Sequence, residues 1–263
     1  MLKLFHHWWL PLLAAATWWS MVVALLILWS RDGFVNYSAA TKPRQTVMYI
    51  SDVGATKYKP IFVGCSAAQG LLFTLSVASE FYLRRIGRLR RHCHWWANWA
   101  LGLSLLFVLM GQLGILFVAI FDLNAYPSTH VSMLVVFIVF VGVSALLNVA
   151  SFAALDMTYM NMNRVKIGLW LKVGWFLIEF VLAVLFVGSQ LIFVNVPAVF
   201  EWAISFLYPF YMLIMAYDLW PAHGKTKGHY PKYNMEYPGQ DLKLSADEFP
   251  LSSPKEQELF QER

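Results

Sequence analysis

The stretch from Trp95 to Phe121, WWANWALGLSLLFVLMGQLGILFVAIF, contains no Asp, Glu, Lys or Arg. A helix needs about 20 mostly apolar residues to cross the hydrocarbon core of a bilayer, and this run exceeds that length. The run is also too long for one strand of a membrane barrel, and backbone polar groups in lipid must be satisfied internally. The stretch therefore predicts a transmembrane helix.

Five further apolar runs have similar length and are separated by polar or charged connections. The chain is 59% hydrophobic and 13% charged, whereas soluble domains carry about 25% charged residues. This composition predicts an all-α polytopic membrane protein, a bundle of six transmembrane helices in residues 1–220. The predicted spans are 8–29, 60–83, 95–121, 130–155, 167–194 and 198–220, with an outer loop over 30–59. Residues 221–263 form a polar, partly acidic segment that predicts a disordered tail.

The first run has a second interpretation as a secretory signal peptide, because it has Lys3 before it and the small residues Ala14, Ala15 and Ala16 within it. The run continues for about a dozen apolar residues beyond that point, which is longer than the apolar region of a signal peptide. We therefore expect a retained span.

Basic residues predict the orientation of the bundle. Six spans put both termini on one side, and most Lys and Arg residues flank the membrane on that side. The positive-inside rule then places both termini in the cytoplasm. The outer loop contains Asn36-Tyr37-Ser38, an N-x-S acceptor, so we expect glycosylation at Asn36.

Several functional classes have no support in the sequence. The net charge of +5 is not carried by a basic, aromatic-interleaved domain, so we expect no nucleic-acid partner. Cys65 and Cys93 offer neither a disulfide framework nor metal-ligand spacing. Nucleophile-elbow, zinc-protease and phosphate-loop motifs are missing. We therefore expect no catalytic residue, metal or cofactor, and a non-enzymatic protein.

Two ionisable residues lie within the fifth predicted span. Glu179 is near its middle, and helical spacing puts Lys172 on roughly the same face. Such residues are candidates for proton or ligand binding because their burial is costly. The alternative is an interhelical hydrogen bond from Glu179 to Gln69, Gln112 or Asn148. We expect Lys172 to extend towards the cytoplasmic surface.

An arginine-rich connection follows the second span. It contains five arginines: Arg84, Arg85, Arg88, Arg90 and Arg91. They lie near the acidic span ends at Glu80, Asp156 and Asp218, so ion pairing is one interpretation. The other is contact with anionic lipid headgroups, where each basic residue contributes about 1 kcal/mol. We predict an anionic-lipid contact and a peripheral partner at this cytoplasmic face.

The outer loop carries the sequence Tyr49-Ile50-Ser51-Asp52-Val53-Gly54-Ala55. Ser, Asp and Gly predict a turn, with side-chain bonds to the backbone and a positive φ at Gly54. Further polar residues are expected on this side at Asp122, His130, Asn195 and Glu201, with Trp202 beside the last. Three interpretations remain: general acid–base catalysis, headgroup binding, or attachment of the loop to the spans.

These features together resemble the DRAM/Frag/Sfk family of six-span membrane proteins. The resemblance rests on the Tyr-Ile-Ser-Asp-x-Gly motif, Pro60 and Phe62, the arginine-rich connection, His130, and Glu201 with Trp202, and it covers residues 8–220. The chain departs from it at Met48, where relatives often have proline.

The resemblance implies three functional alternatives. Sfk-type proteins act at the plasma membrane in recruiting a phosphatidylinositol 4-kinase complex and in distributing lipid between leaflets. Other members remodel the lipid of GPI anchors in the Golgi and endoplasmic reticulum, or modulate autophagy at the lysosome. The basic cytoplasmic face and the polar tail favour the Sfk-type alternative.

Overall fold

The computed structural model describes residues 6–38, 42–159 and 162–230. The described part is all-α and contains no strand. Its helices are α1 (Trp9–Arg31), α2 (Ile50–Gly54), α3 (Lys59–Arg85), α4 (Trp95–Ile120), α5 (Pro127–Thr158), α6 (Asn163–Ser189) and α7 (Val196–Leu219), followed by the 3₁₀ turn η2 (Trp220–Ala222). Within these residues, six helices are long and apolar enough to cross a membrane. The acidic segment from residue 231 onward lies outside the described residues.

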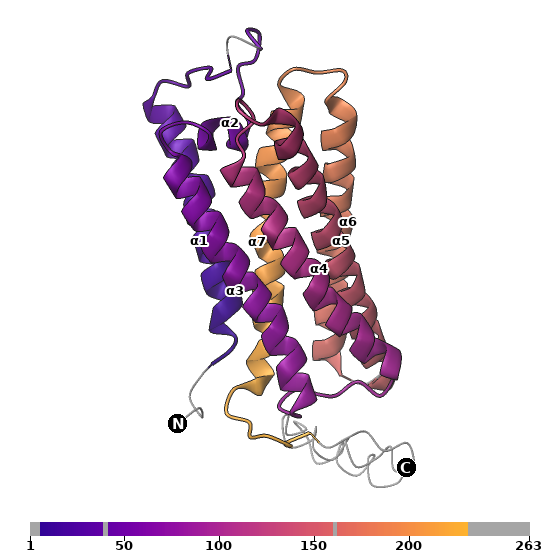
Figure 1. Ribbon diagram of the computed structural model, residues 1–263. Helices are drawn as coiled ribbons and strands as arrows, with labels where there is room; N and C mark the ends of the chain where they lie inside the picture. The colour runs from indigo at the N-terminus through magenta and orange to yellow at the C-terminus, as the bar shows by residue number, and fades with distance from the viewer. Residues whose placement is uncertain (1–5, 39–41, 160–161, 231–263) are drawn as a thin grey trace, which may run out of the picture.

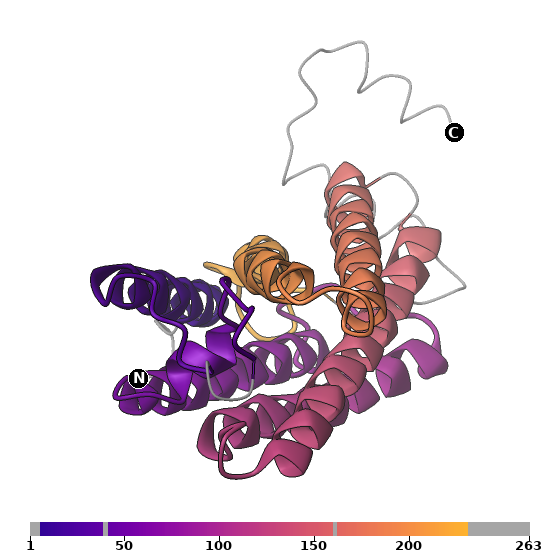
Figure 2. The same cartoon turned by 90° about the horizontal axis from the view of Figure 1, so that it is seen from above.

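The six long helices form a closed bundle in chain order. Each packs against the next one along the chain, and α7 closes the bundle by packing against both α6 and α1 (Figures 1 and 2). The start of α1 and the end of α7 lie at the same end of the bundle (Figure 1), where His6 Nδ1 and His223 Nδ1 are 2.9 Å apart. We call this the termini end. The opposite end, which carries residues 32–38 and 42–58, is the loop end.

Helix boundaries follow local sequence signals. Helices α3, α5 and α7 each have Pro within their first two positions, where a missing N–H costs no intrahelical bond. Helix α5 therefore begins at Pro127, three residues before the predicted His130. Helix α6 ends at Ser189, before the predicted Val194. The last predicted turn belongs instead to the connection between α6 and α7. Next to it, Asn195 Oδ1 accepts hydrogen bonds from Thr46 and Val47 N–H at 2.7 and 3.1 Å.

Small residues allow α4 and α5 to approach closely. A Cβ at Gly111 would lie 2.7 Å from Val141 Cγ2, and one at Gly114 would lie 2.8 Å from the Phe137 backbone nitrogen. Glycine at these positions brings the two backbones together, as is common in membrane helix pairs.

Helix α7 contains Pro209, which lacks the N–H that would bond to the Ser205 carbonyl. The indole of Trp18 supplies a replacement donor, with Nε1 at 2.8 Å from that oxygen. Two neighbouring carbonyls, of Phe206 and Leu207, each accept a further indole N–H, from Trp19 and Trp175, at 3.0 Å. These three indoles link α1 and α6 to the proline turn of α7.

The predicted turn in the outer loop is wrong, because residues 50–54 form the short helix α2, which is buried. Gly54 belongs to this helix. A Cβ there would lie 2.5 Å from Phe62 Cδ1, so the glycine permits close packing of α2 on α3 rather than a positive φ.

The beginning of the predicted tail is folded against the termini end. Gly228 N–H donates to Ile86 O and Tyr230 N–H donates to Gly87 O, both at 2.8 Å. Gly87 has φ +71°, and a Cβ there would lie 2.5 Å from Tyr230 O. Residues 223–230 therefore cover the connection between α3 and α4, contrary to the prediction of disorder from residue 221.

Candidate functional site

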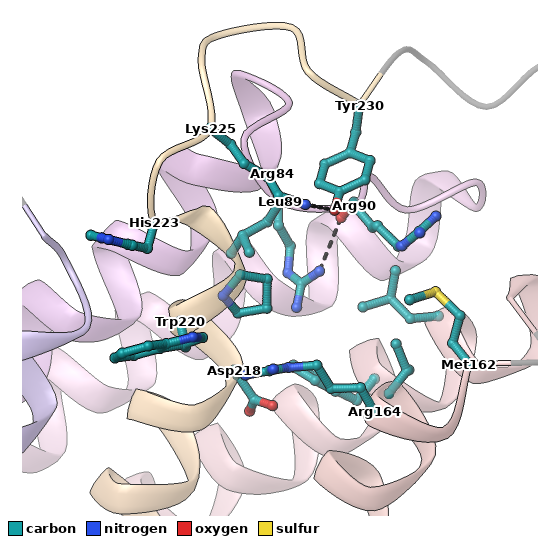
Figure 3. A pocket seen from close by; sticks show the side chains of 14 residues that line it. Arg84, Leu89, Arg90, Met162, Arg164, Asp218, Trp220, His223, Lys225 and Tyr230 are labelled. Atoms are coloured by element: carbon teal, nitrogen blue, oxygen red, sulfur yellow. Dashed lines mark hydrogen bonds between the residues drawn. The ribbon is translucent and has the colours of Figure 1, made fainter. Parts of the chain in front are cut away.

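A pocket of about 280 Å³ opens at the termini end. It lies between the end of α3, the ends of α5 and α7, the start of α6 and residues 223–230 (Figure 3). Among the described residues, its basic lining side chains are Arg84, Arg90, Arg164 and Lys225, and its one lining carboxylate is Asp218. We call it the basic pocket. Apolar side chains, among them Leu89, Phe152 and Leu155, complete its wall.

Arg84 is held by fixed internal partners. It is buried, and Nε and Nη2 donate to Glu80 Oε1 at 3.0 and 2.8 Å. Nη1 donates to the Arg90 carbonyl at 3.0 Å. The second oxygen of Glu80 accepts from Asn148 at 3.1 Å. Arg84 is thus part of an internal ion pair, so the prediction that it contacts lipid on the surface is replaced by a structural role under the pocket.

Lys172 continues this buried network. Its side chain has an exposed fraction of 0%, and Nζ lies 2.8 Å from Asp218 Oδ2 and 2.6 Å from Asn148 Oδ1. Its ammonium also lies 3.1 Å from the centroid of the Phe152 ring, in cation–π contact. The prediction that Lys172 extends to the membrane surface is therefore wrong, because inside the bundle Asp218 compensates its charge and Asn148 accepts a hydrogen bond from it.

The remaining cations of the basic pocket stack on aromatic rings. The Arg90 guanidinium lies 4.9 Å from the ring centroids of both Tyr159 and Tyr230. Arg164 lies 4.2 Å from the centroid of Tyr217 and donates to the Tyr217 carbonyl. Lys225 Nζ lies 4.5 Å from the Tyr230 centroid and donates to the Tyr230 hydroxyl.

Cations near one another change the acidity of neighbouring groups. Burial, followed by the positive charges of Arg90 and Arg164, lowers the pKa of Lys225 to about 8. Burial and then Arg84 lower the pKa of His92 to about 3, and this neutral imidazole has Nε2 at 2.9 Å from the Ser151 hydroxyl. Arg90 and Arg164 thus place positive charge close to Lys225, and such a cationic environment favours an anion.

The other predicted arginines occupy different environments. Arg85 is exposed at the end of α3. Arg88 is half-buried and donates to the Ala222 carbonyl at 2.8 Å, and Arg91 packs beside Gly87. The arginines of this connection thus have three environments: some make structural contacts, some line the basic pocket, and Arg85 is at the surface.

Glu179 lies away from the basic pocket, on α6. Its Oε1 is buried and has no hydrogen-bond partner among the described residues. Gln69 and Gln112 bond instead to the Tyr208 hydroxyl, at 3.4 and 2.8 Å, while Asn148 bonds to Glu80 and Lys172. None of the three predicted interhelical bonds to Glu179 is formed.

At the loop end, Glu201 and Asp52 lie together around α2. Glu201 Oε2 accepts from Ile50 N–H at 3.0 Å and the carboxylate also accepts from Ser51, which satisfies donors at the start of α2. Asp52 is 2% exposed and accepts from Ser38. Burial raises the pKa of Asp52, and the charges of Lys42 and His130 oppose that shift.

The other predicted residues of the loop end hold the outer loop to the spans. Trp202 Nε1 donates to Met48 O at 2.8 Å, and the Tyr49 hydroxyl donates to Gln190 Oε1 at 3.1 Å. His130 Nδ1 lies 2.8 Å from Phe121 O, and Asp122 forms an ion pair with Lys59 at 2.7 Å. Tyr49, Asp52, His130 and Glu201 are therefore gathered near α2, whereas Asp122 belongs to a separate ion pair.

Asn36 has a structural role in the outer loop. Its Nδ2 donates to the carbonyls of Lys42 and Gln45 at 3.0 and 2.8 Å, and its Oδ1 accepts from Ser38 N–H at 2.9 Å. A glycan on Nδ2 would replace one of these donors.

The sequence reasoning missed the contribution of Arg164, Lys225 and Tyr230 to the basic pocket. Arg164 belongs to the basic residues next to the fifth predicted span, and Tyr230 lies in the segment predicted to be disordered, so the sequence does not bring the two together in one pocket. The available signal was the basic and aromatic composition of residues 223–230 directly after a span.

Comparison with known proteins agrees with this architecture. The family model described as the Frag1/DRAM/Sfk1/Cwh43P N-terminal domain matches residues 6–222. The chain is 26% identical over 180 residues to protein SFK1 of Saccharomyces cerevisiae, a match covering 58% of this chain and 51% of that protein. The chain thus spans about half the length of this relative. No solved structure matches the chain. The six apolar helices and the match over residues 6–222 show that the chain belongs to the Frag1/DRAM/Sfk1 family of membrane proteins.

Proposed function

We propose that this protein is a non-enzymatic membrane regulator that organises phosphoinositide synthesis and lipid distribution at the plasma membrane, with its termini end in the cytoplasm. The observation that carries the proposal is the basic pocket and its surroundings, where cations from three segments meet at one end of the bundle. Anionic lipids are concentrated in the cytoplasmic leaflet and attract such a surface.

The match to the Frag1/DRAM/Sfk1 family and to SFK1 supports a membrane role, and the resemblance of the chain to Sfk-type proteins supports a role in organising lipids. Among the described lining residues, Asp218 is the one carboxylate, and Lys172 neutralises it. The pocket therefore offers several cationic groups for an anion, and its one described carboxylate is already paired.

Cells lacking the protein test this function. We expect lower phosphatidylinositol 4-phosphate at the plasma membrane and weaker recruitment of its kinase, both restored by the intact chain. Normal lipid levels and kinase recruitment in the deleted cells would contradict the proposal. A tagged chain in the lysosomal membrane would instead favour an autophagy modulator.

A second candidate function is remodelling of GPI-anchor lipid at the loop end. It is favoured by the proximity of Asp52, Glu201 and His130, whose charges interact, since carboxylate and imidazole groups perform acid–base chemistry. Replacing Asp52 by Asn and measuring the lipid composition of GPI anchors by mass spectrometry tests it. Normal anchors in cells without the protein would eliminate this candidate.

A further inference from the structure

We propose that the basic pocket binds one phosphate-bearing headgroup, with Arg90, Arg164 and Lys225 surrounding the phosphate. The inference deepens the proposed function and rests on it for the orientation of the bundle. It locates one binding site on the basic cytoplasmic face, which the sequence predicts without distinguishing one site from another.

The charge balance of the pocket is the first argument. Two of its charged lining residues are paired internally, since Arg84 binds Glu80 and Asp218 binds Lys172. Arg90, Arg164 and Lys225 come from three separate segments and bring three cationic groups to the wall of one pocket. A phosphate accepts charge-assisted hydrogen bonds from such groups.

The orientation of Arg164 is the second argument. One guanidinium nitrogen donates to Tyr217 O, and the guanidinium carbon lies 4.2 Å from the centroid of the Tyr217 ring. Its Nε is buried and has no hydrogen-bond partner among the described residues. Buried donors are nearly always bonded, so this N–H calls for an acceptor. Phosphate oxygens match the planar arrangement of arginine donors.

The lipid-facing surface next to the pocket is the third argument. A shallow groove lies on α6, lined by Asn163, Lys166, Ile167, Trp170 and Leu171. These positions repeat at helical spacing beside Arg164, and Ile167 and Trp170 are 50% and 66% exposed. A headgroup in the pocket of about 280 Å³ would thus leave its acyl chains room along an apolar helix face. This arrangement favours a lipid over a soluble phosphate ester.

Binding to the purified full-length protein in phosphatidylcholine nanodiscs tests the site, with dioctanoyl phosphatidylinositol 4-phosphate as the probe. We expect Arg164→Gln and Lys225→Gln each to weaken binding at least tenfold, because each removes a charge-assisted hydrogen bond. Lys225→Arg should retain binding. Arg85→Gln is the matched control, since Arg85 is exposed at the same end but does not line the pocket.

Further probes separate the sources of the phosphate. Glycerophosphoinositol 4-phosphate and inorganic phosphate lack acyl chains, and tighter binding of the dioctanoyl lipid than of either supports a lipid ligand. Equal binding of the deacylated ester supports the site with a soluble ligand. The inference is overturned if both glutamine variants bind the dioctanoyl lipid as tightly as Arg85→Gln does. It is also overturned if phosphatidylserine binds every variant as tightly as the dioctanoyl phosphoinositide does.

The outcomes also separate this inference from the proposed function. Loss of binding in Arg164→Gln with normal cellular phosphoinositides would support the site and contradict the function. Altered cellular phosphoinositides with unchanged binding in both glutamine variants would overturn the site and leave the function standing.

Discussion

Lys172 has its ammonium group in the interior of the bundle, between Asp218 and Asn148. A buried ion pair contributes little by itself, but removing one partner leaves the other charge uncompensated. We therefore expect the replacement of Lys172 to lower the stability of the protein more than the replacement of any exposed cation at the termini end.

We expect Lys172→Met to lower the stability of the protein by about 3–5 kcal/mol, because the Asp218 carboxylate would remain buried without its partner. Thermal unfolding in detergent measures the effect. Adding Asp218→Leu should recover much of the loss. Lys166→Met, at an exposed position of the same helix, is the control and should have little effect. Equal stability of the two single variants would contradict the role of the ion pair.

Gly54 is sensitive for steric reasons. Because a Cβ would lie 2.5 Å from Phe62 Cδ1, we expect Gly54→Ala to destabilise the protein by about 1–3 kcal/mol through overpacking. Gly64→Ala is the comparison, since no described heavy atom outside its chain neighbours and its own helix backbone lies within 4 Å of its Cβ position. Thermal unfolding should give the Gly54→Ala variant the lower melting temperature. Equal melting temperatures would show that α2 and Phe62 shift apart at no cost in stability.

At the element scale, helix α7 depends on donors from other helices at its proline turn. Trp18 bonds to Ser205 O, which has lost its helical partner at Pro209, whereas Trp19 bonds to Phe206 O. The Phe206 carbonyl still faces the N–H of Phe210, four residues ahead. The two indoles are therefore unequal in importance although their geometry is similar.

We expect Trp18→Phe to cost about 1–3 kcal/mol, because it leaves a part-buried carbonyl without a hydrogen-bond donor. Trp19→Phe should cost less. Comparing the two by thermal unfolding, and by hydrogen exchange of the amides around Pro209, checks the difference. A larger effect of Trp19→Phe would show that ring packing, rather than the missing proline N–H, determines stability here.

The docking of α2 should depend on pH. The pKa of Asp52 is raised above its usual 3.8 by burial, so protonation favours the folded state. The stabilisation is complete below 3.8 and is lost as pH rises through the raised pKa. We therefore expect the melting temperature of the wild type to fall relative to that of Asp52→Asn as the pH rises from 4 to neutrality. Lys42, His130 and Glu201 surround Asp52, so the comparison with Asp52→Asn isolates its share. A constant difference would contradict the assignment.

At the scale of the whole molecule, the bundle separates two polar ends. The termini end has the basic pocket and the loop end has the α2 cluster, and the apolar helices lie between them. The orientation of these ends in the membrane decides which one meets cytoplasmic lipid and partners.

Cysteine labelling tests the orientation. In a chain with Cys65 and Cys93 replaced by Ser, we expect an impermeant maleimide to label Ser128→Cys on intact cells. It should label Lys227→Cys only after permeabilisation, because the termini end is predicted to face the cytoplasm. Both positions are exposed. The reverse labelling pattern would invert the topology and move the basic pocket to the outer side.

Much of the site could not be read from the sequence, for identifiable reasons. Hydropathy identifies the spans, and Glu80 and Arg84 are four residues apart on one helix, so their ion pair follows from local spacing. Lys172 and Asp218 lie on different helices, and their contact depends on how α6 and α7 pack. The periodicity of apolar residues does not predict how α6 and α7 are rotated relative to each other.

The motif around Asp52 shows the same limit. Its residue types are typical of a turn, but α2 packs against α1, α3, α4 and α7, and Glu201 accepts the N–H of Ile50. These contacts across the chain favour a helical turn over the local preference of the sequence.

The sequence by itself determined that this is a six-helix membrane protein with a basic end and a polar loop, because lipid requires long apolar helices and segregates charge. The tertiary structure alone decided which charges meet: Lys172 with Asp218, Glu201 with the start of α2, and Arg90, Arg164 and Lys225 around one pocket. The physical reason is that hydropathy depends on each residue's own side chain. Ion pairs and pockets depend on the packing of helices that are distant along the chain.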